Sequence, residues 1–181
     1  MSSPLRISVA KANPATATRL AILGRQTFLE TFADAAPAAD MNAFLAHVYG
    51  PEIQLAELRD PRYTFLLAEM QGELVGFAKL WRDSDLGLPA SETTTGRLEI
   101  KQLYVAQDWI GTGLGAALMR RCLALADAEH AAAIVLGVWE HNQRARAFYE
   151  RFGFRVVGQH GFHIGSEVST DLILRKGLAG R

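Results

Sequence analysis

Residues 110–116 read Ile-Gly-Thr-Gly-Leu-Gly-Ala, and this glycine-rich turn is the most informative part of the chain. It follows Arg97–Ala106, whose alternating side chains predict a strand, and leads into Gly113–Glu129, which has a helical pattern. Glycines let a backbone turn tightly, and the first turn of a helix offers unpaired N–H groups at a positive dipole end. The turn is therefore either a cradle for phosphate or a tight connection without a ligand.

Three kinds of phosphate site compete for this turn. A Walker loop requires Lys followed by Ser or Thr after the last glycine, and neither is present. The string fits the dinucleotide pattern G-x-G-x-x-A, but that motif expects an acidic residue at the end of the next strand. Asp127 and Glu129 still lie within the predicted helix. The third candidate ligand, the pyrophosphate of coenzyme A, needs only one strand, one turn and one helix.

A second motif follows after one predicted strand, Ala132–Val138. Asn142 is placed to cap a helix over Gln143–Phe152, which Gly153 ends. The spacing of Asn142, Arg146 and Tyr149 puts these three residues on one helix face. The glycine turn and this motif, in this order, are much more specific than the glycines alone.

The remaining pattern predicts a single domain with a mixed α+β sheet. Leu5–Val9 reads as a strand, and helical stretches follow from Asn13-Pro14 to Pro37, over Ala38–Tyr49 and over Pro51–Asp60. Strands are expected over Tyr63–Glu69, Glu73–Trp81, Phe154–Val157 and Ser169–Leu174, with a polar loop over 82–96 and a loose tail over 176–181. In the strand before the glycine turn, simple alternation puts Leu98, Ile100, Gln102 and Tyr104 on one side, and Glu99, Lys101, Leu103 and Val105 on the other.

Composition narrows the class of protein. The 181 residues are 49% apolar, and 19 basic residues balance 19 acidic ones, so we expect neither a nucleic-acid partner nor a membrane partner. The single cysteine, Cys122, excludes an internal disulfide and a cysteine-based zinc site, and we expect it to pack inside its helix. No metal is expected. The amino terminus lacks an apolar signal segment, which indicates a soluble, cytoplasmic protein.

On these motifs the chain resembles the GCN5-related N-acetyltransferases. The turn occupies the family's pyrophosphate motif, Gln/Arg-x-x-Gly-x-Gly/Ala, although Ile110 stands where the family usually has Gln or Arg. Asn142–Phe154 matches a second family motif, Asn-x-x-Ala-x-x-x-Tyr-x-x-x-Gly-Phe. The resemblance implies the family's fold, a mixed sheet of six to seven strands that splays open after the fourth, flanked by about four helices.

A closer resemblance is to bacterial PaiA-type spermidine/spermine N-acetyltransferases. It is carried by Thr27-Phe28, Thr31-Phe32, Gly137–Asn142 and the segment Gly158–Ile173, which includes His160 and Asp171. This resemblance implies transfer of an acetyl group from acetyl-CoA to a primary amine, a polyamine above all, by direct attack in a ternary complex. Two alternatives stay open: another amine, such as an amino acid, an antibiotic or a protein amino terminus, and a non-catalytic acyl-CoA-binding regulator.

The resemblance also implies roles for individual residues. An alkylamine with a pKa of about 10 is neutral in roughly one molecule per thousand at pH 7, so the reaction needs a base. Glu99 matches the family's catalytic glutamate, and Tyr149 matches the tyrosine that protonates the coenzyme A thiolate. Asn142 and Tyr149 are also expected to contact the cofactor. Backbone groups of the following residues are expected to hold its pantetheine and pyrophosphate: Leu103, Tyr104, Val105, Gly111, Thr112, Gly113, Leu114, Gly115 and Ala116.

A polycationic acceptor needs carboxylates and aromatic faces. The candidates that the sequence offers are Phe28, Glu30, Phe32, Trp139 and Glu140, with Asp34 and Asp40 nearby. His160 is expected to be structural rather than catalytic. The exposed strand edges of this fold are compatible with a homodimer.

Overall fold

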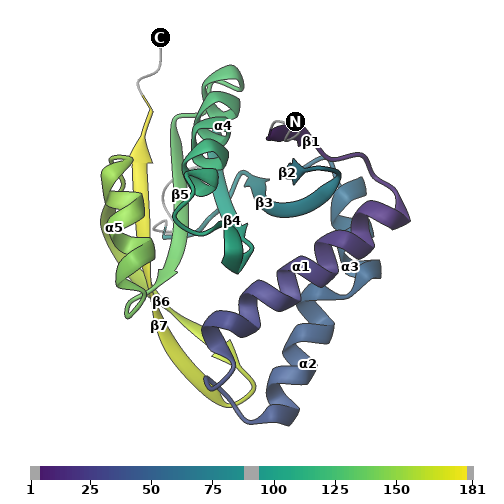
Figure 1. Cartoon of the computed structure of the whole chain (residues 1–181). Coiled ribbons are helices and arrows are strands. Elements are labelled where there is room, and N and C mark those ends of the chain that lie inside the picture. The colour runs from purple at the N-terminus through teal and green to yellow at the C-terminus, as the bar shows by residue number, and fades with distance from the viewer. Residues whose placement is uncertain (1–4, 88–93, 179–181) are drawn as a thin grey trace.

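The structure, a computed structural model, describes residues 5–87 and 94–178. Within these ranges the chain forms a seven-stranded sheet and five α-helices, in agreement with the helical segments predicted from the sequence (Figure 1). The strands are β1 (Arg6–Val9), β2 (Tyr63–Met70), β3 (Glu73–Arg82), β4 (Arg97–Val105), β5 (Ala133–Trp139), β6 (Arg155–Ile164) and β7 (Glu167–Gly177). The helices are α1 (Pro14–Phe32), α2 (Ala38–Tyr49), α3 (Pro51–Arg59), α4 (Leu114–Ala128) and α5 (Gln143–Arg151), with a short 3₁₀ turn, η1 (Gln107–Trp109).

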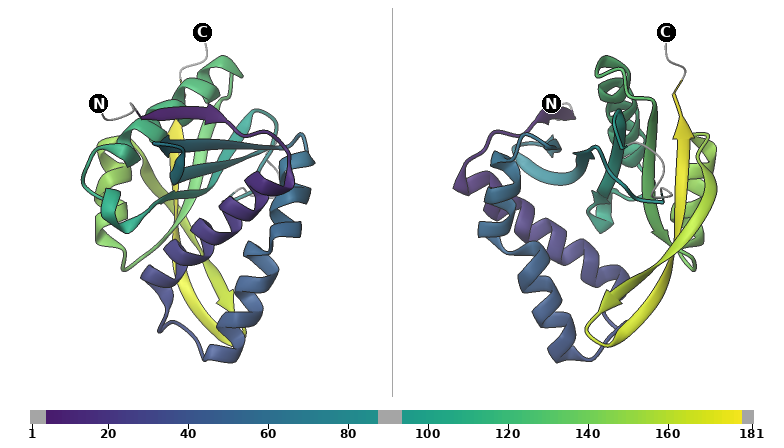
Figure 2. Two further views of the ribbon diagram at one scale, coloured as in Figure 1. Left: turned by 45° about the vertical axis from the view of Figure 1, so that its right-hand side comes forward. Right: turned by 180° about the vertical axis from the view of Figure 1, so that it is seen from behind.

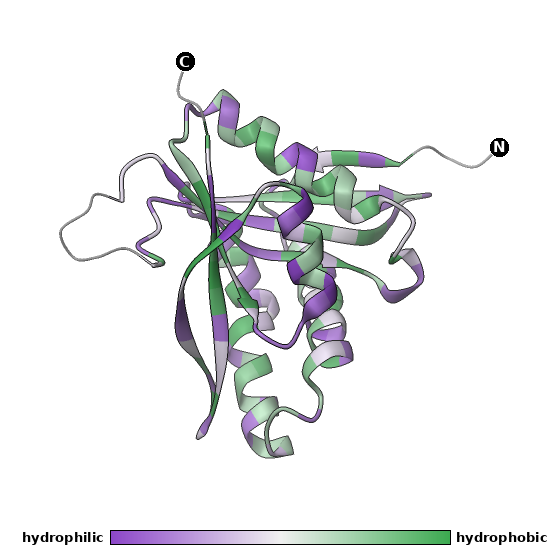
Figure 3. Cartoon of the chain, turned by 90° about the vertical axis from the view of Figure 1, so that its left-hand side faces the viewer, coloured by the Kyte–Doolittle hydropathy of each residue, from purple (hydrophilic) through white to green (hydrophobic). Residues whose placement is uncertain are grey.

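The sheet is mixed, as predicted, with the strand order β1-β2-β3-β4-β5-β7-β6. Among the described strands, β4 and β5 pair in parallel and the other neighbours pair antiparallel. The helices cover both faces of the sheet (Figure 2). Helices α4 and α5 pack on one face, and α1 and α2 on the other. Figure 3 shows hydrophobic colour along the central strands and alternating colour around the helices, which is the pattern expected of elements that bury one side.

The parallel pairing of β4 with β5 is short. It runs over Arg97–Glu99 on β4 and Ala133–Val135 on β5. Beyond that point β4 continues to Val105 beside β3, and β5 continues to Trp139 beside β7, without pairing with each other. The sheet therefore splays open after its fourth strand, as expected, and leaves one backbone edge of each diverging strand free for a ligand.

A bulge in β4 corrects the predicted alternation of its side chains. Ile100 pairs with Leu80 and Gln102 pairs with Lys79, so Lys101 is an extra residue with no partner of its own. The insertion reverses which side each later residue faces. Leu98 and Ile100 therefore share the α4 side of the core with Leu103 and Val105, whereas Tyr104 packs on the α1–α2 side. Simple alternation is wrong here because it assumes an unbroken period of two.

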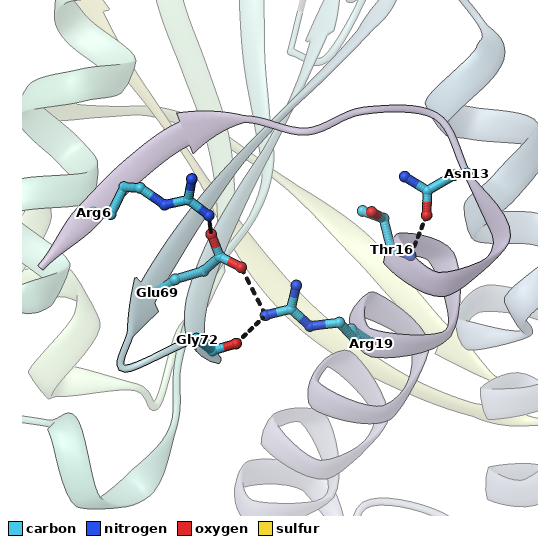
Figure 4. Close-up of polar contacts among 6 residues, drawn as sticks. All are labelled: Arg6, Asn13, Thr16, Arg19, Glu69 and Gly72. Atoms are coloured by element: carbon cyan, nitrogen blue, oxygen red, sulfur yellow. Dashed lines mark hydrogen bonds and ion pairs between the residues drawn. The ribbon is translucent and has the colours of Figure 1, made fainter. Parts of the chain in front are cut away.

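The amino-terminal elements are fixed by polar contacts (Figure 4). The Asn13 side chain caps α1 by accepting a hydrogen bond from the Thr16 amide at 2.9 Å, as the sequence predicts. The carboxylate of Glu69 on β2 pairs with Arg6 of β1 and, at 2.8 Å, with Arg19 of α1. Burial opposes ionisation of Glu69, but the hydrogen bonds from Arg19 and Arg6 outweigh it and lower the pKa of this carboxyl.

The carboxy-terminal hairpin is longer than the sequence suggests. Strands β6 and β7 extend well beyond Phe154–Val157 and Ser169–Leu174, and Lys176, expected in a loose tail, pairs with Ile134 of β5. Residues 179–181 of that tail, and 88–93 of the predicted loop, lie outside the described residues. The hairpin reaches α2, where a β-carbon on Gly165 would overlap Asp40. None of the described helices is long and apolar enough to cross a membrane.

Candidate active site

The glycine turn lies exposed at the carboxyl end of β4. Gly111 and Gly113 have φ angles of +84° and +93°, a region that side chains with a β-carbon rarely adopt. A β-carbon built on either glycine would meet nothing within 4 Å. The backbone at this turn therefore faces open space, and the geometry agrees with the phosphate cradle expected from the sequence.

The first turn of α4 supplies the donors of this cradle. Gly113 is the N-cap and has no side chain to satisfy the amides that follow, and the first helical hydrogen bond runs from Ala117 N–H to Gly113 O at 3.0 Å. The amides of Leu114, Gly115 and Ala116 precede it and point out of the helix end. Free amides and a positive helix end together suit a diphosphate, so this turn fits the coenzyme expected there.

The diverging part of β4 leads directly to this turn. A β-carbon on Gly115 would touch Val105 of β4 and Phe148 of α5, each at 3.8 Å, so the three elements meet here. The backbone of Leu103–Val105 lies along the side of β4 that β5 has left. The cofactor-binding segments that the sequence singled out are thus brought together.

Helix α5 places the other two predicted cofactor residues. The Asn142 side chain accepts a hydrogen bond from Ala145 N–H at 3.0 Å and caps α5, as predicted. Tyr149 is 9% exposed and packs edge-on against Phe154 at 5.8 Å. Its hydroxyl has no hydrogen-bond partner among the described residues, and burial strongly raises its pKa. This neutral phenol lies on the α5 side of the opening, by which we mean the gap between the diverging ends of β4 and β5. A neutral phenol in this position is able to donate a proton.

Glu99, the candidate base, sits where β4 and β5 begin to part. It pairs with Val135 at the last parallel step and is 8% exposed. One carboxylate oxygen accepts a hydrogen bond from Ser84 Oγ at 2.7 Å, and the other lies 3.4 Å from Lys101 Nζ. Lys101 also lies over the Trp81 ring, 4.5 Å from its centroid. Glu99 therefore has fixed partners in the folded chain, and its role as a base stays a prediction.

A pair of tyrosines lies on the α1–α2 side of the opening. The hydroxyls of Tyr104 on β4 and Tyr49 on α2 are 2.8 Å apart. Burial raises the pKa of Tyr104 to about 12 and that of Tyr49 still further. Tyr49 reaches this position because α1 has a glycine beneath it: a β-carbon on Gly24 would lie 2.7 Å from the Tyr49 ring. Both hydroxyls are neutral over the physiological pH range.

The structure brings some of the predicted acceptor residues together and separates others. Phe32 packs edge-on against Trp139 with ring centroids 5.5 Å apart, and Phe28 packs against Phe32 at 4.7 Å. Phe28 is buried in the cluster formed with α2, whereas Glu30 is exposed and accepts a hydrogen bond from Gln26 at 3.0 Å. Glu140 is partly exposed at the end of β5. The aromatic residues thus pack together, whereas Glu140 lies 3.7 Å from the His141 side chain.

Asp171 belongs to a sequence motif in which no local signal indicates a functional role for it. It pairs with Trp139 of β5 on one side and His160 of β6 on the other, so the three side chains share the α1–α2 face. Burial raises the pKa of Asp171, and the nearby His160 works against this shift. Asp171 was part of a motif, but only the strand register could show that it shares a face with Trp139.

Two other features lie apart from the opening. A surface hollow of about 660 Å³ is formed by the end of α1, the start of α2 and Glu167 of β7, and Asp34 lines it. Cys122 is fully buried in α4, and burial raises the pKa of its thiol to about 12. A thiol in this position packs and does not react, which confirms the expectation from the sequence.

Comparison with known proteins defines the class. The profile of the acetyltransferase (GNAT) family matches residues 25–154. An uncharacterised N-acetyltransferase of Lactobacillus delbrueckii subsp. lactis is 30% identical over 156 residues, which cover 86% of this chain and 88% of that protein. The chain therefore belongs to the GNAT family. It is an N-acetyltransferase, and acetyl-CoA is its acetyl donor.

Two further relatives are more distant. The spermine/spermidine N(1)-acetyltransferase of Bacillus subtilis is 29% identical over 96 residues, covering 51% of this chain and 60% of that one. The crystal structure of the PaiA N-acetyltransferase from Thermoplasma acidophilum in complex with coenzyme A superposes with a TM-score of 0.75. That alignment covers 96% of this chain and 99% of the other at 20% identity, and it shows that the fold is shared.

Proposed function

We propose that this N-acetyltransferase acetylates a polyamine such as spermidine or spermine, by direct attack of the amine on acetyl-CoA in a ternary complex. The observation that carries the proposal is the aromatic face beside the opening of the sheet, where Phe32 and Trp139 meet. Aromatic faces attract ammonium groups, and a polyamine carries several. The similarity to the spermine/spermidine N(1)-acetyltransferase of Bacillus subtilis supports the same acceptor class.

In the proposed complex, the amides of the glycine turn bind the pyrophosphate of acetyl-CoA. The free edge of β4 at Leu103–Val105 receives the pantetheine arm, much as a sheet edge receives an added strand. Asn142 and Tyr149 contact the coenzyme from α5. The thioester supplies the electrophilic carbonyl, and this arrangement directs it into the gap between β4 and β5.

The acceptor reaches that gap from the face of α1 and α2, because α4 and α5 cover the other face. In our proposal Glu99 takes a proton from the amine, directly or through water, which releases the lone pair for attack. Tyr149 then gives its proton to the departing thiolate. A phenol kept neutral by burial suits this role, because it holds its proton until a charge develops beside it.

The acceptor is tested with a panel of amines and thiol release as the readout. The panel contains spermidine, spermine, aspartate, an aminoglycoside and a peptide with a free amino terminus, each at equal concentration. We expect kcat/KM for the two polyamines to exceed that for every other amine by about tenfold or more, which corresponds to about 1.4 kcal/mol of transition-state binding. Equal inactivity on both polyamines, with turnover of another amine, would replace the polyamine by that acceptor.

A further inference from the structure

One carboxylate on the α1–α2 face, that of Asp171, has His160 as its neighbour on β6. Among the described residues, Asp171 makes no hydrogen bond and no ion pair. It is only partly exposed, and it lies between Trp139 and His160 in the register of β5, β7 and β6. A half-buried carboxylate without a cation carries a desolvation cost that a bound cation would offset.

The surroundings of Asp171 leave room for such a cation. The neighbouring residue of β5 is Gly137, which is exposed. A β-carbon on Gly137 would lie 3.5 Å from Asp171 Oδ2 and 3.2 Å from His160 Nε2. Any side chain at position 137 would therefore cover the carboxylate and the imidazole. The glycine keeps both groups accessible from the side where β5 has separated from β4.

Asp171 also lies at the level of the opening. Trp139, its partner on β5, is four residues beyond Val135, where the parallel pairing ends. Tyr104 occupies the matching level of β4 once the extra residue at Lys101 is allowed for. The charge of Asp171 contributes to the raised pKa of Tyr104, which places the two groups within electrostatic range of each other. Tyr104 on β4 and Trp139 on β5 thus lie on opposite strands of the gap, and Asp171 lies one strand behind Trp139.

The carboxylates of Glu99 and Asp171 differ in how far contacts within the protein already occupy them. Glu99 is held by Ser84 and Lys101 at the closed end of the gap. Asp171 lies beside Trp139, which packs against Phe32, so an ammonium group bound there would have both a negative charge and aromatic rings near it.

We infer that Asp171 is the specificity-determining carboxylate that binds the ammonium group of the acceptor, with His160 beside it and Trp139 beneath the alkyl chain. The inference rests on the proposed transfer to a cationic amine. It assigns to β7 a function in acceptor recognition, separate from the coenzyme-binding function of β4, α4 and α5.

The test is a calorimetric titration of spermidine into the full chain saturated with coenzyme A, a complex that cannot turn over. We expect Asp171→Asn to weaken spermidine binding by about tenfold or more, because a charge-assisted hydrogen bond is lost. Asp171→Glu, which keeps the charge, should recover part of the affinity. The matched control is Glu73→Gln, an exposed carboxylate at the start of β3, which should bind spermidine like the wild type. Coenzyme A affinity should stay within about twofold in all variants, as expected of substitutions outside its site.

A second measurement needs no variant. Spermidine added to the wild-type complex with coenzyme A should shift the side-chain carboxyl carbon resonance of Asp171 and leave that of Glu73 unchanged. Equal spermidine affinity in wild type and Asp171→Asn, an unshifted Asp171 resonance, or no binding to the wild type would each overturn the inference. Thiol release is scored separately. If spermidine is acetylated but binds equally to the wild type and to Asp171→Asn, the role of Asp171 is wrong and the proposed acceptor stands. If spermidine binding depends on Asp171 but no thiol is released, the proposed acetylation of spermidine is wrong and the role of Asp171 in binding stands.

Discussion

The hydroxyl of Tyr49 on α2 and the hydroxyl of Tyr104 on β4 lie 2.8 Å apart and form one hydrogen bond. This bond ties α2 to β4 at the level where β4 has already separated from β5. Tyr49 also packs against Phe28 of α1 with ring centroids 5.6 Å apart. The pair therefore links the positions of α1 and α2 to the diverging part of β4.

The tyrosine pair predicts a loss of stability at alkaline pH. The pKa of Tyr104 is raised by burial from 10.0 to about 12, so the native state keeps a proton that the unfolded chain releases. The contribution to stability is complete below pH 10 and is lost as the pH rises from 10 towards 12. Urea unfolding at pH 8, 10 and 11 measures it. A free energy of unfolding that does not fall over this range would contradict the burial of these hydroxyls.

Replacement of one partner tests the hydrogen bond itself. Tyr49→Phe should lower the free energy of unfolding at pH 8 by about 1–2 kcal/mol, because the buried Tyr104 hydroxyl loses its partner. Tyr63→Phe is the control, since the Tyr63 hydroxyl makes no hydrogen bond within the described part of the chain. Equal effects of the two substitutions would show that the bond contributes nothing.

The glycine turn predicts how a charge at the start of α4 affects coenzyme binding. Ala116→Glu places a carboxylate beside the expected pyrophosphate and should weaken coenzyme A binding roughly 100-fold through repulsion. The fold should not suffer, because a negative charge in the first turn of a helix is stabilising. Ala116→Gln adds similar bulk without charge and is the matched control in calorimetry. Equal affinities of the two variants for coenzyme A would contradict the proposal that the glycine turn binds the pyrophosphate.

Tyr149→Phe separates chemistry from packing. The ring contacts with Phe148 and Phe154 remain and only the hydroxyl is removed. We expect kcat to fall by about tenfold or more, in keeping with the loss of a general acid, while the melting temperature stays the same. Steady-state kinetics and thermal unfolding measure the two quantities. Turnover within about twofold of the wild type would exclude Tyr149 as the proton donor, because even a weak general acid contributes more.

Glu99→Gln should alter the pH dependence of the rate. Without a base, the reaction depends on amine that is already neutral in solution, and this fraction falls about tenfold for each pH unit below the amine pKa. The variant should therefore lose most activity at low pH. Glu129→Gln is the control, because Glu129 pairs with Arg82 away from the opening. Parallel pH–rate profiles for Glu99→Gln and the wild type would remove Glu99 from the role of base.

Much of this architecture could be predicted because its signals are local. The caps at Asn13 and Asn142 and the glycine turn between a strand and a helix follow from single residues and their immediate neighbours. The splayed sheet followed from the family resemblance carried by those motifs. Local signals thus predicted the glycine turn before α4 and the cap of α5, and the binding of the coenzyme there stays a prediction.

The acceptor side could not be read in the same way. Which strands lie next to each other, and in what register, is a long-range property, so the grouping of Trp139, Asp171 and His160 was hidden. The glycines at 158 and 161 also interrupted the alternation that marks β6 as a strand. A pattern of side chains cannot reveal pairings that backbone hydrogen bonds impose.

The extra residue at Lys101 has a consequence beyond its own position. Deleting it would exchange, in one step, the inward and outward side chains of the last four residues of β4. Leu103 and Val105 would leave the layer under α4, and Tyr104 would lose Tyr49. A single inserted residue in β4 thus governs both the packing of α4 on the sheet and the attachment of α2 to its opposite face.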